Sequence, residues 1–492
     1  MLKKNVIILT FLFILTNYCL AEEVSLESFI KKSLEVHPKT KVSLLEFKKT
    51  LAENLAYTAT EDWNMFVSYS RTQGATVFGS YVSSAVSSSF DAYTTKSLSS
   101  YGTSLQIGVS QIAATNQPTV GNFALPDSNT YGLKVQITQP LLKNAFGKAD
   151  QYPLKLKVYL DEIAQITYQQ QIQDFITILT EEYIKWHYLE NDIKILKDQV
   201  KKSKKQLKIT ERQQKLGAAE ILDIITSKQN VLLRENSLLS KEFELTNQRK
   251  KIYFYMTGNV SESNYQLTSI VDENVLNKTL LKDSSSSLLF LEEISLFKQL
   301  FDINEKIASL TLEYESENMK PNLDIYLSAD LDNYKTYLEN QANDDDNYTL
   351  KGDAYPFTLG FSFSKPLKNI VQNSAQESAK ENLFKTISTN KLNLNNLKES
   401  IIMMYDQLTF LTNQKIIIKE SIRLSSKAAN LEYKKFDQGR SNSLQFYHEY
   451  KNQQLSYELQ LNQIKYLEQS LINQLFNMND YYITSYNLED IK

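Results

Sequence analysis

Four segments of the chain alternate strictly between apolar and polar residues, the pattern of a β-strand with one apolar face. They lie at about 62–72, 131–139, 322–333 and 356–365. The apolar positions of the second and fourth segments are Leu133, Val135, Ile137, Leu359, Phe361 and Phe363. Each segment is short and one-sided, so we expect four strands that lie between water and an apolar environment.

The residues between the first two strands, 75–130, are rich in Ser, Thr, Ala and Tyr. One short piece within them, SLQIGVSQ (104–111), alternates in the manner of a strand. We expect a long exposed loop here, and whether it adds a strand stays open. A polar loop with the sequence NDDDN (343–347) separates the other two strands.

Long helical patterns account for most of the remaining chain, in keeping with only 12 glycines and 8 prolines among 492 residues. We expect helices over 25–60 with a break at His37-Pro38, from Pro140 or Pro153 to Leu216, and over 221–256. Further helices are expected over 286–320, 367–438 and on to about Met478. A helix of 65 to 75 residues is roughly 100 Å long, which predicts a coiled-coil neighbour along its length.

Heptad-like spacing supports coiled-coil packing. The 3-4 spaced positions are Ile193, Leu196, Val200, Ser203, Leu207 and Thr210 in one helix, and Tyr457, Leu461, Ile464, Glu468 and Leu471 in another. Glu468 is a polar interruption of the second series. The other helix faces are rich in Lys, Gln and Asn, and we interpret them as solvated.

The same order of elements occurs twice: helix, strand, loop, strand, proline, long helix, glycine turn, helix. Pro140 and Gly217 are 77 residues apart, and Pro366 and Gly439 are 73 residues apart. A spacing this large indicates a duplicated domain and not a solenoid repeat. The pattern divides the chain into a first repeat (22–258), a linker (259–284), a second repeat (285–480) and a C-terminal tail (481–492).

The first 21 residues have the features of a secretory signal peptide, with Lys3 and Lys4 before an apolar run and a cleavage site after Ala21. A transmembrane anchor is the alternative, but the run is short for one. Lipidation of Cys19, the single cysteine, is disfavoured by the bulky Tyr18 before it. Without this segment the chain contains no thiol.

Composition excludes several function classes. The 54 basic and 57 acidic residues nearly balance, so nothing indicates a nucleic-acid partner. The three histidines, His37, His187 and His448, are far apart and show no metal-ligand spacing. We expect no enzyme, no cofactor and no metal. The NDDDN segment is interpreted as a solvated loop and not as a divalent-cation site.

Four strands cannot close a barrel alone, and lipid does not tolerate an open sheet edge. Three copies of the chain would supply 12 strands, an even number within the known range. The apolar positions would then face lipid, and a polar set would face a water-filled lumen: Lys134, Gln136, Asp324 and Asp330. The alternative is a soluble sheet that packs on a core.

Pro140 and Pro366 would lie where a barrel strand passes into a helix. Proline has no N–H for a ladder hydrogen bond, yet it fits the first turn of a helix. It is therefore suited to a strand-to-helix junction.

These features together resemble the TolC family of outer-membrane efflux channels. The resemblance covers essentially the whole chain after residue 21. It rests on QITQPLL and SFSKPL, the two strand–proline–helix units, and on KLGAAEILD and FDQGRSNSL, the two helix–glycine–helix turns. It implies a mainly α fold with membrane β-structure: a homotrimer whose 12-stranded β-barrel in the outer membrane continues into an α-helical barrel across the periplasm.

The resemblance also implies a function. The family forms passive conduits from the periplasm to the exterior, for drug efflux or for type I protein secretion. Its partners are a periplasmic adaptor protein and an inner-membrane pump. The exported substrate cannot be identified from the sequence.

Residues at the periplasmic tip follow from the same resemblance. The family's two glycine turns form the tip and dock the adaptor, and they match Gly217 and Gly439 here. The family's aspartate six residues after the first glycine is Asp223. The tyrosine three residues before the second glycine is replaced by Phe436, which cannot make the same hydrogen bond.

The chain departs from the family in the second turn. Where well-studied members carry two aspartates that line a constriction, this chain has Gln445 and His448, with Glu449 as the nearest carboxylate. We therefore expect an entrance that is less selective for cations. His448 is interpreted as a surface histidine, with a pH-responsive group as the alternative.

Two other functions stay open. A periplasmic coiled-coil adaptor or structural rod would explain the helices but not the four one-sided strands. A surface adhesin or receptor could use the loop at 75–130.

Overall fold

The structure is a computed structural model. It describes residues 22–78, 81–120, 127–217, 219–260, 267–269, 275–278, 281–338, 348–354, 357–438, 440 and 445–486. The expected signal peptide, Gly439 and the NDDDN segment lie outside these residues. The chain divides into two compact units. We call them the helical unit (1–47, 165–299 and 392–492) and the sheet unit (48–164 and 300–391).

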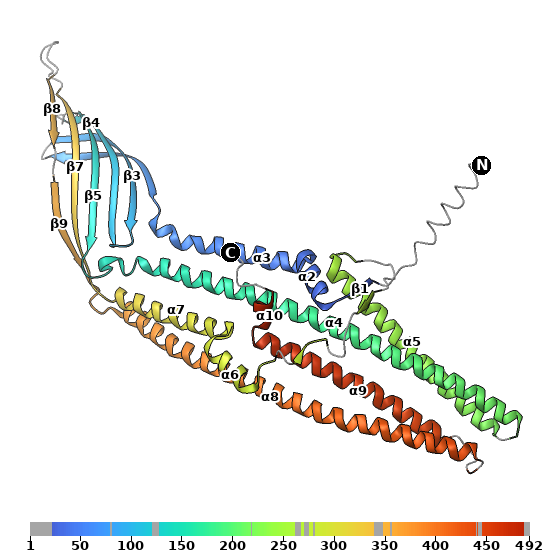
Figure 1. Ribbon diagram of the computed structural model, residues 1–492. Coiled ribbons are helices and arrows are strands. Elements are labelled where there is room, and N and C mark those ends of the chain that lie inside the picture. The colour runs from blue at the N-terminus through green and yellow to red at the C-terminus, as the bar shows by residue number, and fades with distance from the viewer. Residues whose placement is uncertain are drawn as a thin grey trace, which may run out of the picture. The chain divides into compact units, whose positions relative to one another are not determined.

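Long helices dominate the structure (Figure 1). In chain order they are α2 (Leu26–Val36), α3 (Pro38–Asn54), α4 (Gln151–Lys215), α5 (Ile221–Thr257), α6 (Ser284–Glu293), α7 (Leu296–Asn318), α8 (Ile370–Asp437), α9 (Gln445–Met478) and α10 (Tyr481–Ser485). The expected break at His37-Pro38 is confirmed, because α2 ends before His37 and α3 begins at Pro38. Among the described residues, no helix combines the length and apolar character required to cross a membrane.

The core of the helical unit contains the innermost face of α4. Phe175, Leu179, Tyr183 and Trp186 are at most 1% exposed. The Tyr183 hydroxyl donates to the carbonyl of Val24 at 2.6 Å. Val24 belongs to β1 (Glu22–Val24), which pairs in parallel with β6 (Leu267–Ser269). The expected linker thus contains a strand that joins the start of the described chain to this core.

Amide and carboxylate side chains occupy buried positions between the long helices. Asn462 of α9 donates to the carbonyl of Tyr188 on α4 at 2.9 Å, and Asn473 of α9 donates to that of Thr177 on α4 at 2.9 Å. Glu468, the polar interruption of the heptad pattern, is 6% exposed, and Lys415 Nζ of α8 lies 2.6 Å from its carboxylate. Buried polar groups are stabilising where they are paired, so these contacts fix the alignment of one helix against the next.

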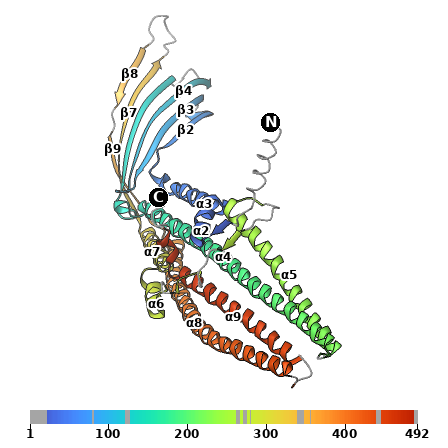
Figure 2. The same ribbon diagram turned by 45° about the vertical axis from the view of Figure 1, so that its right-hand side comes forward.

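The sheet unit contains an antiparallel sheet, drawn in Figures 1 and 2 with its strands side by side. Its strands are β2 (Asn64–Phe78), β3 (Tyr81–Leu98), β4 (Thr103–Val120), β5 (Asp127–Pro140), β7 (Asn322–Leu338), β8 (Tyr348–Ala354) and β9 (Phe357–Ser364). The order across the sheet is β2-β3-β4-β5-β7, and both β8 and β9 pair with β7.

The expectation of one long loop at 75–130 is wrong, because the described residues of this range include β3, β4 and the adjoining parts of β2 and β5. The alternating piece at 104–111 lies within β4. The strands escaped recognition because serine and threonine occupy both faces of β3 and leave no alternation in hydropathy. The chain therefore has a β3–β4 hairpin between the two strands expected from the first half.

The connection from β5 to α4 also differs from the expectation. Pro140 is the last residue of β5, but α4 begins only at Gln151, close to the expected alternative start at Pro153. A short 3₁₀ turn (Ala145–Gly147) lies between them. In the second half, Pro366 lies between the end of β9 and the start of α8 at Ile370. Both prolines mark strand-to-helix junctions, although neither begins a helix.

The segment that connects β5 to α4 packs against the turn between β3 and β4. A Cβ atom added to Gly147 would lie 1.7 Å from the carbonyl oxygen of Ser99, and one added to Gly102 would lie 2.5 Å from that of Asn144. Both glycines have a φ near +70°. Ser97 Oγ also donates to Asp150 at 2.9 Å. The backbone of the hairpin turn thus rests directly on the backbone that leads into α4.

Candidate functional site

One face of the sheet carries rows of mostly apolar side chains, to which β3 contributes Ala92, Thr94 and Lys96. In one row Val67 opposes Ala92, Ala92 opposes Val109, Val109 opposes Leu133, and Leu133 opposes Leu331. Neighbouring rows contain Met65, Ile107, Val135, Ala329, Phe357, Leu105, Ile137, Leu327, Leu359, Ile325, Phe361, Leu323 and Phe363. The six apolar positions expected to share a face do so.

This apolar face is uncovered in the single chain. Leu359 and Phe361 are each 75% exposed, and Met65 is 71% exposed. On β7 the face extends from Leu323 to Leu331, or roughly 26 Å along the strand. A continuous exposed apolar surface of this extent indicates an interaction with lipid or with another protein surface.

Aromatic and polar rows mark where the apolar face ends. Tyr69 opposes Phe90, and Tyr131 opposes Gln111 in the same row. The next row contains Arg71 and Asn129 in the corresponding positions. An apolar band about 25 Å tall with aromatic residues at its border is typical of membrane-spanning strands.

The opposite face of the sheet is mostly polar on β5 and β7, whereas Phe66 and Tyr93 stack on it where β2 meets β3. Lys134 and Asp330 oppose each other on β5 and β7, with 3.9 Å between Nζ and Oδ1. Ser70 and Ser89 are joined by a hydrogen bond of 2.8 Å between their hydroxyl groups. Gln136 lies in the row next to Lys134 and donates to Thr138 at 3.2 Å.

The turn between α4 and α5 begins at Gly217, which has a φ of +74°. Nothing lies within 4 Å of the position of an added Cβ atom, so glycine is favoured here by backbone conformation and not by lack of space. Asp223 does not project into solvent: it is 6% exposed, and its carboxylate accepts from the backbone N–H of Glu220 at 3.1 Å. This contact caps the start of α5.

The residues of the second turn that are expected to line the channel entrance differ in exposure. Gln445 and Glu449 are exposed on the first turn of α9. His448 is 7% exposed, so its interpretation as a surface histidine is wrong. Gly439 lies outside the described residues. Phe436 is buried at 6% exposure and serves as a core residue near the end of α8.

His448 joins α9 to α5. Its Nε2 atom forms a hydrogen bond of 2.9 Å with Ser227 Oγ. Burial lowers the pKa of His448 to about 4, and the nearby Arg234 guanidinium contributes in the same direction, whereas Asp223 opposes it. The imidazole is therefore neutral at pH 7 and serves as an interhelical hydrogen-bonding group.

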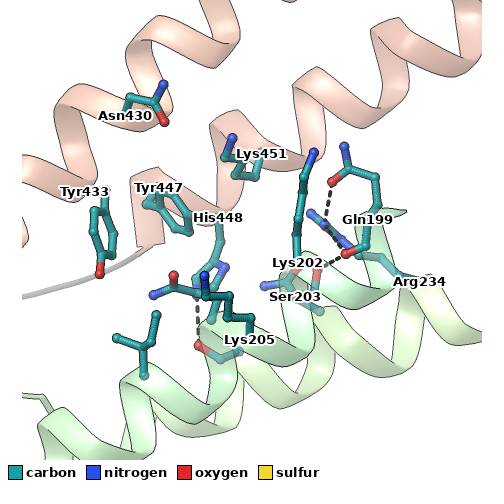
Figure 3. A pocket seen from close by; sticks show the side chains of 14 residues that line it. Gln199, Lys202, Ser203, Lys205, Arg234, Asn430, Tyr433, Tyr447, His448 and Lys451 are labelled. Carbon is teal, nitrogen blue, oxygen red and sulfur yellow. Dashed lines mark hydrogen bonds between the residues drawn. The ribbon is translucent and has the colours of Figure 1, made fainter. Parts of the chain in front are cut away.

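A cavity of about 370 Å³ lies beside His448 among α4, α5, α8 and α9 (Figure 3). Four basic side chains line it, and no carboxylate does: Lys202, Lys205, Arg234 and Lys451. Burial lowers the pKa of Lys451, as does the proximity of Lys202. The lining of this cavity is therefore basic, with Glu458 as a nearby carboxylate that acts in the opposite direction on the pKa of Lys451.

Arg234 is the buried member of this group, at 6% exposure. Its guanidinium donates to Gln199 Oε1 at 3.1 Å and to Asn452 Oδ1 at 2.9 Å. Among the described residues, no carboxylate lies within ion-pair distance of it. No sequence pattern pointed to this arginine, because its role depends on the amide groups of two other helices.

The described histidines and carboxylates of the helical unit are spread over separate parts of it. Within the described ranges, no three His, Cys, Asp or Glu side chains gather in the manner of a metal site. His187 and His37 are both in the helical unit but have separate surroundings, with His187 beside Ser269 and His37 beside Phe175. The described residues thus provide an apolar sheet face, two helix turns and a cavity with a basic lining.

Comparison with known proteins identifies the fold. No protein-family model and no curated protein sequence match the chain. Among solved structures, the outer-membrane channel OprN has a TM-score of 0.65 at 13% identity, over 92% of this chain and 89% of that one. The outer-membrane protein VceC from Vibrio cholerae has a TM-score of 0.62 at 12% identity, over 92% and 96%.

The Campylobacter jejuni CmeC outer-membrane channel is similar as well, with a TM-score of 0.57 at 12% identity, over 95% of this chain and 90% of that one. These likenesses extend over nearly the whole length of each protein. The chain therefore has the fold of the outer-membrane efflux channels, the fold that its resemblance to the TolC family implied.

Proposed function

We propose that the chain is the outer-membrane channel of a tripartite efflux pump or a type I secretion system, a passive conduit from the periplasm to the exterior. The observation that carries this proposal is the uncovered apolar face of the sheet, which has the height and the aromatic border of a membrane-spanning wall. A periplasmic rod would leave this face in water, at a large cost in free energy. The adhesin alternative loses most of its free loop, since the described residues within 75–130 belong to strands.

The assembly is proposed to be a homotrimer in outer-membrane lipid, with the helical part in the periplasm. An antiparallel sheet with two open edges cannot lie in lipid as a single copy, so neighbouring copies must pair these edges. The turns at Gly217 and Gly439 would dock the adaptor protein of an inner-membrane pump. Exposed apolar residues next to the first turn fit this role, with Leu216 78%, Ile221 68% and Leu222 66% exposed.

The orientation can be tested with single cysteines in a chain whose one native cysteine lies in the expected signal peptide. Thr115 lies on β4 beyond the apolar band, and Leu216 lies at the first helical turn. In intact cells a membrane-impermeant maleimide should label Thr115→Cys at once. It should label Leu216→Cys only after the outer membrane is permeabilised. Labelling of neither site before lysis would contradict the proposal, and the parent chain supplies the background.

A matched pair of substitutions on β9 tests which face meets lipid. Phe361 lies on the apolar face and Ser362 on the polar face, and both side chains are exposed in the single chain. Phe361→Arg should disfavour insertion by about 2–4 kcal/mol, because it places a charge against hydrocarbon. Ser362→Arg should insert normally. The amount of assembled trimer in isolated outer membranes measures the difference, and equal loss in both variants would count against a lipid-facing apolar side.

The entrance is proposed to lack an acidic ring. Gln445 is exposed where well-studied members of the family carry an aspartate, and the cavity nearby is lined by basic side chains. We expect trivalent cations to block the purified channel weakly, and Gln445→Asp to increase their affinity about tenfold or more, since three copies would add three charges. Planar-bilayer recordings with periplasmic-side addition measure this. Strong block of the unchanged channel would refute the idea.

A further inference from the structure

We propose that each chain contributes six strands to the membrane wall, so that three copies close an 18-stranded barrel instead of the 12-stranded one that four strands per chain would give. The inference rests on the proposed function, because it takes the homotrimer from there. Its consequence is a wider passage through the outer membrane, one that suits bulky cargo.

The count of six depends on β8 and β9 occupying one strand position. Asp332 of β7 opposes Ala354 of β8, and Ala329 opposes Phe357 of β9. The step of three residues from Ala329 to Asp332 on β7 equals the step of three from Ala354 to Phe357. β8 and β9 therefore pair with β7 in one continuous register. The positions across the sheet are β2, β3, β4, β5, β7 and the combined β8–β9.

The β3–β4 hairpin is part of the wall and not an appendage. On β4, Ile107 (38% exposed) and Val109 (50% exposed) continue the apolar face on the same side as Leu133, and β3 adds Ala92 to the row of Val109. β3 pairs with β2 over the full length of β2, and β4 pairs with β5 from Ser104 to Ala114.

The turn between β3 and β4 is also held in place by close contacts. Gly102 and Gly147 bring two backbone segments together too closely for a Cβ atom. The Gln139 side chain of β5 donates to the carbonyl of Tyr101 in the hairpin turn at 3.0 Å. The hairpin could leave the sheet only by breaking these contacts and two complete strand pairings.

The directions of the strands permit closure. Every neighbouring pair in the sheet is antiparallel, so six positions alternate in direction and the two edge positions run oppositely. The β2 edge of one copy can therefore pair antiparallel with the β8–β9 edge of the next. β2 has 15 residues, and the opposite edge has 7 residues in β8 and 8 in β9, so the edges also match in length.

The number of strands sets the width of the barrel. At about 4.8 Å between strands and a tilt of about 40°, 18 strands give a backbone diameter of roughly 36 Å and 12 strands give roughly 24 Å. The passage would thus be about 1.5 times as wide.

Disulfide pairs in the full-length chain test the strand order. Val67 and Ala92 are direct partners on β2 and β3, whereas Val67 and Leu133 are separated by two intervening strands, or roughly 14 Å. We expect Val67→Cys with Ala92→Cys to form an intrachain disulfide and Val67→Cys with Leu133→Cys to form none. A disulfide between positions 67 and 133 would show that β2 and β5 pair directly, which overturns the inference and leaves the proposed channel in place.

A deletion tests the width. Removal of residues 74–126, with Asn-Gly inserted between Gln73 and Asp127, joins β2 to β5 through a two-residue turn and keeps Val67 in the row of Leu133. The control trims only the outer ends: residues 75–84 and 115–127 are each replaced by Asn-Gly, which keeps all six strand positions. The trimmed ends follow the pairs Gly74–Ala85 and Ala114–Ser128.

Electron microscopy of the particles in nanodiscs gives the barrel diameter in end-on views. The full-length and trimmed chains should show three-fold particles of equal barrel diameter, and the deletion variant a barrel about two-thirds as wide. A full-length barrel no wider than that of the deletion variant overturns the inference alone. Absence of three-fold particles from the full-length chain, with the 67–92 disulfide intact, would overturn the proposed trimer and the closed wall together.

Discussion

Replacement of Gly147 by alanine is expected to destabilise the sheet unit by about 3 kcal/mol or more, because two separate costs coincide there. The backbone of Gly147 has a φ of +71°, which an L-residue adopts at a cost of roughly 1 kcal/mol. The added Cβ atom would also lie 1.7 Å from the carbonyl oxygen of Ser99, so one of two backbone segments must move. The loss should appear as a lower temperature of unfolding for the purified channel.

Gly217→Ala is the matched control. Its φ of +74° is nearly the same, but nothing lies within 4 Å of the added Cβ atom, so it should cost only the roughly 1 kcal/mol of backbone strain. Gly147→Ala should therefore be far more harmful than Gly217→Ala. Equal effects of the two substitutions would show that the β3–β4 turn can move away from the start of α4 without loss.

Acid is expected to destabilise the helical unit as the pH falls from about 6.5 to 4. Burial lowers the pKa of His448 and of His187 to about 4, against an ordinary value of 6.5. The unfolded chain therefore binds more protons than the folded chain in this window, and stability falls with falling pH. Each histidine contributes up to about 3 kcal/mol of stability that is present above pH 6.5 and lost toward pH 4.

The variants His448→Gln and His187→Gln assign the effect. Glutamine can keep a hydrogen bond to Ser227 while it removes the titrating group, so each single variant should show a shallower loss of stability between pH 6.5 and 4. The double variant should show the smallest change in the free energy of unfolding between pH 6.5 and 4, because both buried histidines are gone. Denaturant unfolding of the detergent-solubilised channel at a series of pH values measures it. An unchanged slope in the double variant would mean that other groups control the response to acid.

The prediction of the long helices and four of the strands was possible because each repeats its apolar positions with its own period. In the strands around Leu133 and Phe361 every second residue is apolar. Because successive side chains point to opposite faces of a strand, all of these apolar residues lie on one face. The heptad positions from Ile193 to Thr210 likewise lie on one side of a helix. Several of them are buried in the helical unit, with Leu196 at 1% exposure and Thr210 at 0%.

The candidate site was predicted less well, for a specific reason. Gln445 and Glu449 were identified by position alone, and their exposure agrees with an entrance role that stays a prediction. His448 and Asp223 occupy the positions named for them, but each is buried and bound to a neighbouring group: His448 to Ser227, and Asp223 to the start of its own helix. A sequence shows which groups can form hydrogen bonds and not which partners meet them across helices.

Hydropathy patterns were enough to identify the alternating strands, the long coiled-coil helices, the two strand-to-helix junctions at Pro140 and Pro366, and the resemblance to the outer-membrane channels. The number of strands, the burial of His448 and the basic cavity around Arg234 became apparent from the folded chain alone. This difference arises because a period in hydropathy reveals an element only when one of its faces is apolar. β3 carries small polar residues on both faces, so its identity as a strand depends on the hydrogen bonds that β2 and β4 supply on either side.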